Sequence, residues 1–151
     1  MSYWYDIIAN VKADLDSALT TLSVPTVIKR RNTYVGTDPL PVVIISPGDQ
    51  EVVKSTDFNL GTTVIYPVIV NLIYPDDRIN DLAADAQAYL DIRQAIRQRL
   101  YYPLLINVNT VYDVNGEATK PFTLYDQKST YSTTQWVCTY QNLEQRRAYS
   151  P

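Results

Sequence analysis

The stretch TTVIYPVIVNLIY, residues 62–74, decides the fold together with the run from Asp81 to Leu100 that follows it. The first stretch is β-branched or aromatic at most positions and apolar on both alternating faces. Such a pattern is typical of a strand that is covered from both sides. The second run repeats apolar side chains at helical spacing. The sequence therefore predicts a long buried strand that turns into a long helix.

This predicted helix has arginines on its apolar side. Its apolar stripe consists of Leu82, Ala86, Tyr89, Ile96 and Leu100, with Ile79, Leu90 and Ile92 on the flanks. Arg93 and Arg97 fall within the stripe. Either their long stems cover apolar surface with the charge at the rim, or a neighbouring chain completes an arginine-bearing face. Asp85 and Glu117 are candidate partners for these arginines.

Around these two elements the chain alternates between a helical pattern, short apolar runs and turn residues. Apolar residues at steps of three and four predict an amphipathic helix over residues 3–22, which Ser2 caps and Pro25 ends. The remaining predicted strands cover residues 27–31, 41–47, 51–55, 108–114 and 132–143. Residues 117–129 are polar and give no clear pattern. The sequence thus predicts an α/β (α+β) domain, a mixed and mostly antiparallel sheet flanked by two long helices.

Two segments contribute little to a core of their own. Residues 48–61 contain few apolar side chains, which predicts a protruding arm. Residues 144–151 form a polar tail that we expect to be mobile. The chain also has 13 tyrosines and 2 phenylalanines. Tyrosine suits surfaces that become buried when subunits meet, although half-buried sheet positions explain many of them equally well.

Composition limits the class of protein. A chain of 151 residues with 46% hydrophobic and 19% charged residues fits one globular domain, 1–151. The net charge of −3 argues against a protein that holds nucleic acid through a basic surface. The single cysteine, Cys138, and the absence of histidine exclude an intramolecular disulfide and a Cys–His nucleophile pair. We therefore expect a buried structural thiol, a reducing cytosol as the place of synthesis, and no membrane span.

The sequence carries no motif for catalysis or cofactor binding. It has no Gly-rich phosphate loop, zinc-ligand spacing or nucleophile elbow, and only four glycines. Asp76, Asp77 and Asp81 form the most acidic cluster, and they are interpreted as residues that favour the positive end of a helix. The alternative, a metal site, lacks the glycine and terminal glutamate of a calcium loop. We expect no enzyme, no cofactor and no metal.

The order of the predicted elements resembles that of the tail terminator and related tail-completion (neck) proteins of tailed bacteriophages. The resemblance rests on the opening helix through Leu22, the segment PVVIISP at 41–47, the strand VIVNLIY at 68–74 running into Asp76-Asp77, and the helix from Leu82 to Leu100. It covers most of the chain and depends on pattern, because the family has no signature motif. Residues 122–131 have no counterpart in it, and the terminal Arg146-Arg147 fit a neck protein equally well.

The resemblance implies a virion protein that forms a homohexameric ring on the finished tail tube, stops its polymerisation and contacts the head connector. DNA would pass through the lumen without specific binding. Candidate subunit-interface residues are Glu51, Val52, Val53, Lys54, Phe58, Arg93, Arg97, Tyr101, Arg146 and Arg147. Two alternatives remain: a head-completion or neck (connector) protein of the same class, and a small binding module or enzyme of another class.

Overall fold

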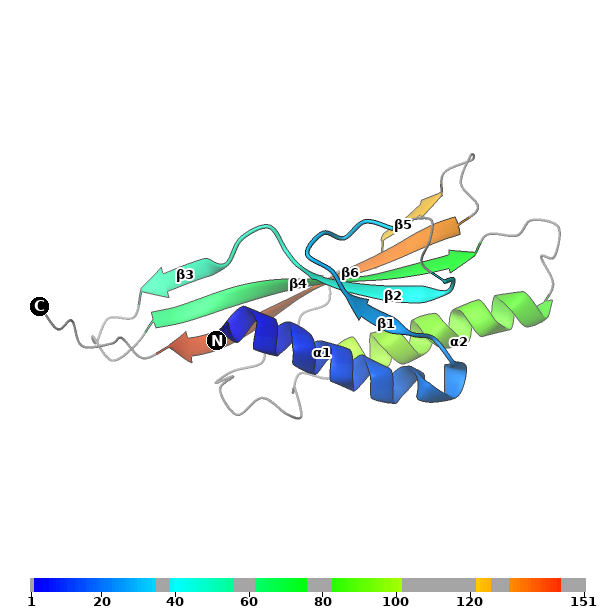
Figure 1. Ribbon diagram of the computed structural model, residues 1–151, viewed down its shortest axis with the longest axis horizontal. Helices are drawn as coiled ribbons and strands as arrows, with labels where there is room; N and C mark the ends of the chain where they lie inside the picture. Colours follow the sequence, from blue (N-terminus) through cyan, green and yellow to red (C-terminus); the bar gives the residue numbers. More distant parts are fainter. Residues whose placement is uncertain are drawn as a thin grey trace, which may run out of the picture.

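The computed structural model describes residues 2–34, 39–55, 62–75, 83–101, 122–125 and 131–144. Within these ranges the chain forms α1 (Tyr3–Leu19), a 3-10 turn η1 (Thr20–Leu22), β1 (Thr26–Ile28), β2 (Val42–Pro47), β3 (Val52–Ser55), β4 (Thr62–Pro75), α2 (Ala83–Leu100), β5 (Phe122–Tyr125) and β6 (Tyr131–Glu144). Figure 1 shows the helices α1 and α2 lying side by side against one long twisted sheet. The α+β class predicted from the sequence is therefore confirmed.

The described strands form one six-stranded sheet with the order β1-β2-β4-β6-β5, and β3 pairs with β4 outside this path. Only β1 and β2 run parallel, and every other pair is antiparallel. The long strands β4 and β6 pair along their full lengths, from Thr62 opposite Glu144 to Pro75 opposite Tyr131. The predicted mixed, mostly antiparallel sheet is thus present, with β4 at its centre.

Helix α1 has the N-terminal cap and the apolar stripe that the sequence predicts. The Ser2 hydroxyl accepts a hydrogen bond of 3.2 Å from the Tyr5 backbone amide, which satisfies one free donor of the first turn. The buried side chains of the helix recur every three or four residues: Ile7, Ile8, Val11, Asp14, Leu15 and Leu19. They pack on one face of the sheet in the main hydrophobic core. Asp14 is the one charged member of this stripe, and the sequence pattern does not single it out.

The strand β4 is covered on both faces only in its second half, which corrects the expectation for the whole stretch. From Val64 to Val70 buried and half-buried residues alternate, and then residues 70–74 are all buried. The second face of this half is covered by a small cluster around Ile44 and Ile73, against which Tyr34 and Leu40 pack. The first half lacks such a cover among the described residues, and Ile65 and Ile69 on that face are only half-buried.

The predicted stripe of α2 is confirmed at Ile96 and Leu100 but not at the start of the helix, which is a second correction. Its buried residues are Ile92, Ile96 and Leu100, whereas Ala86 is exposed and Leu90 is 57% exposed. All of residues 83–88 are exposed, because the first turns of the helix extend past the part of the core that the helix covers. An apolar stripe assigned to the whole helix therefore includes residues of turns that do not pack on the core.

Arg99, which the predicted stripe leaves out, forms an ion pair with α1, whereas Arg93 is half-buried and Arg97 is exposed. The Nη2 atom of Arg99 lies 2.5 Å from Oδ2 of Asp14 on α1, and the two side chains are 14% and 7% exposed. This ion pair joins the two helices where they cross over the sheet. It is a feature of the tertiary fold, since 85 residues separate the partners in sequence.

A proline in the central strand has a specific place in the sheet. Pro67 lies between the parts of β4 that pair with β2 and β3, and its carbonyl accepts hydrogen bonds from the Gly48 amide (2.9 Å) and from the Trp4 indole (3.0 Å). The missing N–H of Pro67 faces the same junction, so no bond of the β4–β6 ladder is lost. A Cβ atom on Gly48 would meet the Pro67 ring at 2.7 Å. The junction therefore requires glycine at position 48.

Three sequence predictions fall wholly or partly outside the described residues. The strand at 108–114, the acidic residues Asp76, Asp77 and Asp81, and the tail after Glu144 belong to this group. The predicted arm, residues 48–61, is described through Ser55, and its residues 52–55 form β3, which pairs with β4. Residues 122–125, in the polar segment that gave no clear pattern, form the edge strand β5.

Candidate assembly surfaces

The described interface candidates lie on two separate elements, β3 and α2. Glu51, Val52, Val53 and Lys54 are all exposed, and the two valines are 51% and 63% exposed. Tyr101, directly after α2, is 48% exposed. Phe58, Arg146 and Arg147 lie outside the described residues, as does Glu117.

The strand β3 is an open edge that presents apolar side chains. It pairs with β4 through one edge, and no described strand pairs with its other edge. The register places Val53 opposite Val64 and Val52 opposite Ile65, so the two valines point to opposite faces. Glu51 directly precedes β3, and its charge acts on Tyr66, which lies on the same face of the sheet as Val64 and Val53. Exposed valines beside a free row of backbone donors and acceptors are typical of a surface that another chain covers.

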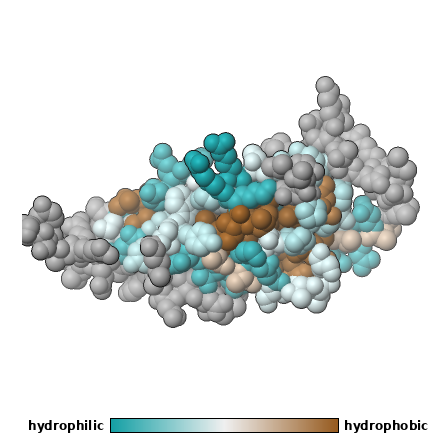
Figure 2. Space-filling model, viewed as in Figure 1, coloured by the Kyte–Doolittle hydropathy of each residue, from teal (hydrophilic) through white to brown (hydrophobic). Residues whose placement is uncertain are grey.

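This edge belongs to a ribbon that projects from the body. Figure 1 shows β3 together with the adjoining ends of β4 and β6 extending past the N-terminal end of α1. In Figure 2 hydrophobic atoms are visible at this same end of the molecule. The ribbon is a regular structure with a fixed register rather than a loop, and so it can present Glu51 and Val53 in a defined geometry.

The root of the ribbon is held by aromatic contacts. The Tyr66 hydroxyl donates a hydrogen bond to the Glu144 carboxylate, and its ring lies 5.7 Å from that of Trp4. Burial, the hydrogen bond to Glu144 and the nearby charge of Glu51 all raise the pKa of Tyr66 above its ordinary value. Tyr66 is therefore a neutral donor at physiological pH, and it occupies a buried sheet position as the second interpretation of the tyrosines predicts.

The outer side of α2 borders a cleft of about 380 Å³ lined by Leu90, Arg93, Gln94, Arg97 and Trp136. Trp136 is on β6 and is 1% exposed, whereas Leu90 and Arg97 are exposed. Arginine, glutamine and the indole N–H all supply hydrogen-bond donors, and glutamine alone supplies an acceptor. The cleft therefore combines an apolar wall with an excess of donors.

Two of these donors lack an acceptor within the described part of the chain. The Trp136 Nε1 atom is buried without a hydrogen-bond partner there. No acidic side chain of those ranges forms an ion pair with Arg97. Arg93 lies with its guanidinium carbon 5.4 Å from the centre of the Tyr89 ring, and its Nη1 atom is 3.5 Å from the Tyr89 hydroxyl. The rim interpretation thus describes Arg93, which stacks on its own helix, better than Arg97.

Asp85, a candidate partner for these arginines, has a different role. It accepts a hydrogen bond of 2.9 Å from the Tyr74 hydroxyl at the end of β4. The Tyr74 ring lies 4.9 Å from that of Tyr89, whose hydroxyl is 3.1 Å from Oγ1 of Thr134. Burial, followed by the hydrogen bond to Asp85, raises the pKa of Tyr74 to about 12. These contacts fix α2 on the sheet and position the cleft beside it.

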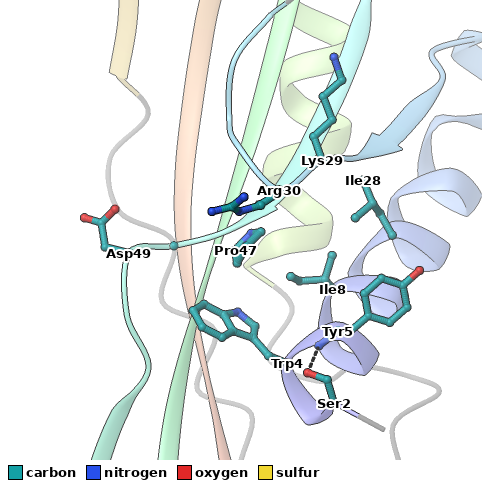
Figure 3. A pocket seen from close by; sticks show the side chains of 10 residues that line it. Ser2, Trp4, Tyr5, Ile8, Ile28, Lys29, Arg30, Pro47 and Asp49 are labelled. Atoms are coloured by element: carbon teal, nitrogen blue, oxygen red, sulfur yellow. Dashed lines mark hydrogen bonds between the residues drawn. The ribbon is translucent and has the colours of Figure 1, made fainter.

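A second cleft, of about 520 Å³, lies at the start of α1. Figure 3 shows Trp4 and Ile8 of α1 on one side, with Pro47 behind them and Lys29 and Arg30 on the strand side. Its lining is mainly apolar. Ser2 and Asp49 also line it, and the Ser2 hydroxyl accepts the capping hydrogen bond from the Tyr5 amide.

Other kinds of site are also not found within the described ranges. No group of three or more potential metal ligands occurs there. Cys138 is a fully buried free thiol, and burial raises its pKa to about 12, as expected for a structural residue. None of the described helices has the length and apolar character that a membrane span needs.

Comparisons with known proteins find similarity to chains of solved structures. No protein-family model matches the chain, and no curated protein matches it significantly. A chain of the solved structure "Virion of native gene transfer agent (GTA) particle" is similar with a TM-score of 0.42 and 16% sequence identity. The alignment covers 90% of this chain and 93% of that chain. At this TM-score the similarity does not assign a fold family or a role.

Proposed function

We propose that this chain is a structural virion protein that forms a closed ring at the head-proximal end of a phage tail. In this role it ends polymerisation of the tail tube and joins the tail to the head connector, and it performs no catalysis. The proposal starts from the resemblance in element order and is supported by the surfaces described above. It places the protein in the virion after assembly in the host cytoplasm, with DNA passing through the lumen without specific binding.

The observation that carries the proposal is the projecting ribbon with its open edge strand β3. A subunit that works alone gains nothing from leaving Val52 and Val53 exposed beside unpaired backbone groups, because such an edge promotes aggregation. A subunit that meets a neighbour there buries both. The ribbon and the α2 cleft are different surfaces of one chain, and contacts between unlike surfaces generate rings when the rotation closes.

The first test is the size of the assembly in solution. Light scattering after gel filtration should give a discrete multiple of the subunit mass, with six copies expected, and negative-stain images should show rings. A protein that stays monomeric at about 100 µM, far above the range of stable protein complexes, would contradict the proposal.

The second test distinguishes a terminator from a neck protein by the defect of particles that lack the chain. Tails longer than normal indicate a terminator, since nothing stops the tube. Filled heads that leak or do not join tails of normal length indicate the neck alternative. Normal particles would exclude both.

A further inference from the structure

We propose that the cleft beside α2 binds the Glu51 carboxylate of a neighbouring copy of this chain. This inference rests on the ring of the proposed function and specifies its contact: Glu51 and Val53 on the ribbon of one copy, and the α2 cleft on the next. Two features carry it: the donor excess of the cleft and the chemistry of the exposed ribbon.

The donors that line the cleft favour a hydrogen-bond acceptor with a negative charge. Arg97 is exposed and has no acidic partner in the described ranges, Arg93 lies beside it one turn away, and Gln94 adds an amide. Trp136 contributes an apolar part of the lining, and its Nε1 atom is buried. Two guanidinium groups one turn apart favour a carboxylate, which accepts charge-assisted hydrogen bonds from both.

The ribbon supplies a carboxylate in the matching apolar setting. Glu51 is exposed, and Val53 on the same face is 63% exposed. Leu90 at the edge of the cleft is 57% exposed and gives Val53 an apolar surface to cover. Asp91 also lies beside Leu90, but it is on the same helix as the cleft, so it could reach a second cleft only through a contact of like surfaces. The contact of unlike surfaces that a ring requires favours Glu51.

Charge reversal tests the pairing. Glu51→Arg and Arg97→Glu should each raise the concentration of half-assembly by about 30-fold or more, since each leaves a like-charge contact in the interface. The double variant Glu51→Arg/Arg97→Glu should assemble again, because the exchanged charges attract. Ser17→Arg and Ala13→Glu introduce the same charges at exposed positions of α1, outside both surfaces, and both variants should assemble as wild type does.

A mixture gives an independent readout. The two single variants, each dissociated alone, should form an assembly with alternating subunits when combined, because positions 51 and 97 then carry opposite charges at every contact. This is possible only in a ring with an even number of subunits. In a Trp4→Phe background Trp136 is the only tryptophan, and its fluorescence should change on assembly of the otherwise wild-type chain.

The outcomes separate this inference from the proposed function. If the wild type forms rings and both single reversals leave them intact, the cleft contact is overturned and the ring stands. If Asp91→Arg dissociates the assembly and Glu51→Arg does not, the contact involves like surfaces and the inference is also overturned. A monomeric wild type contradicts the proposed function itself.

Discussion

Replacing Arg99 by alanine tests how the two helices are held together. The Asp14 carboxylate is 7% exposed and lies 2.5 Å from the Arg99 guanidinium, so the substitution removes a cation from beside a buried charge. Removing one partner of such a pair costs about 3–5 kcal/mol. For a chain of this size, about 3 kcal/mol corresponds to a decrease in Tm of roughly 6–12 °C. Urea unfolding followed by circular dichroism measures the change, at one fixed protein concentration because assembly also adds stability.

Two further variants show whether burial is the cause. Lys12→Ala breaks an ion pair with Asp16 on the outside of α1, whose side chains are 35% and 44% exposed, and should cost no more than about 1 kcal/mol. Asp14→Leu combined with Arg99→Met removes both buried charges and should recover most of the loss. If Arg99→Ala unfolds at the same urea concentration as Lys12→Ala, the argument for a buried pair between the helices is refuted.

Two other predictions concern the sheet. Gly48→Ala should destabilise the protein by about 1–3 kcal/mol, because the added Cβ meets the Pro67 ring at 2.7 Å. Ser46→Ala, which removes a buried hydroxyl without a partner in the described ranges, should not be destabilising in the same thermal melts, and equal stability of the two variants would contradict the reasoning. For Tyr74 the folded-state pKa of about 12 exceeds the unfolded value of 10.0, so its contribution to stability is complete below about pH 10 and is lost as the pH rises to about 12. Tyr74→Phe should therefore lose less stability than wild type between these pH values, and parallel curves from urea titrations would exclude this role of the hydroxyl.

The sequence predicts structural features that arise from neighbouring residues better than those that arise from residues far apart in the chain. The cap by Ser2 and the apolar stripe of α1 are properties of adjacent turns, and both are confirmed. The pair Arg99–Asp14 joins residues 85 positions apart, so no local pattern could reveal it. The same limitation produced the error on α2. A stripe averaged over exposed and packed turns included Arg97, which is exposed, and left out Arg99, which pairs with Asp14 of α1.

The sequence predicted which β3 and α2 residues belong to the candidate site, but it did not predict how they are arranged in space. The sequence indicates that the exposed residues of β3 and the arginines of α2 require partners. It does not indicate the cleft, because Trp136 comes from β6 and looks like an ordinary core residue in the strand pattern. The signal that reveals it is the position of Trp136 of β6 beside Arg93 and Arg97 of α2, which only the tertiary fold brings together.

The division of β4 into two halves links folding to assembly. From Val70 onward both faces of the strand are buried, so this half stabilises the subunit. In the first half Ile65 and Ile69 are only half-buried on the face opposite the helices. A sheet is stabilised when both of its apolar faces are buried. A ribbon of three strands that is covered on one side leaves apolar surface of its other face in contact with water. If neighbouring copies supply the cover, the ribbon should be protected from hydrogen exchange more in the assembled protein than in the dissociated Glu51→Arg variant, while the second half of β4 should be protected equally in both.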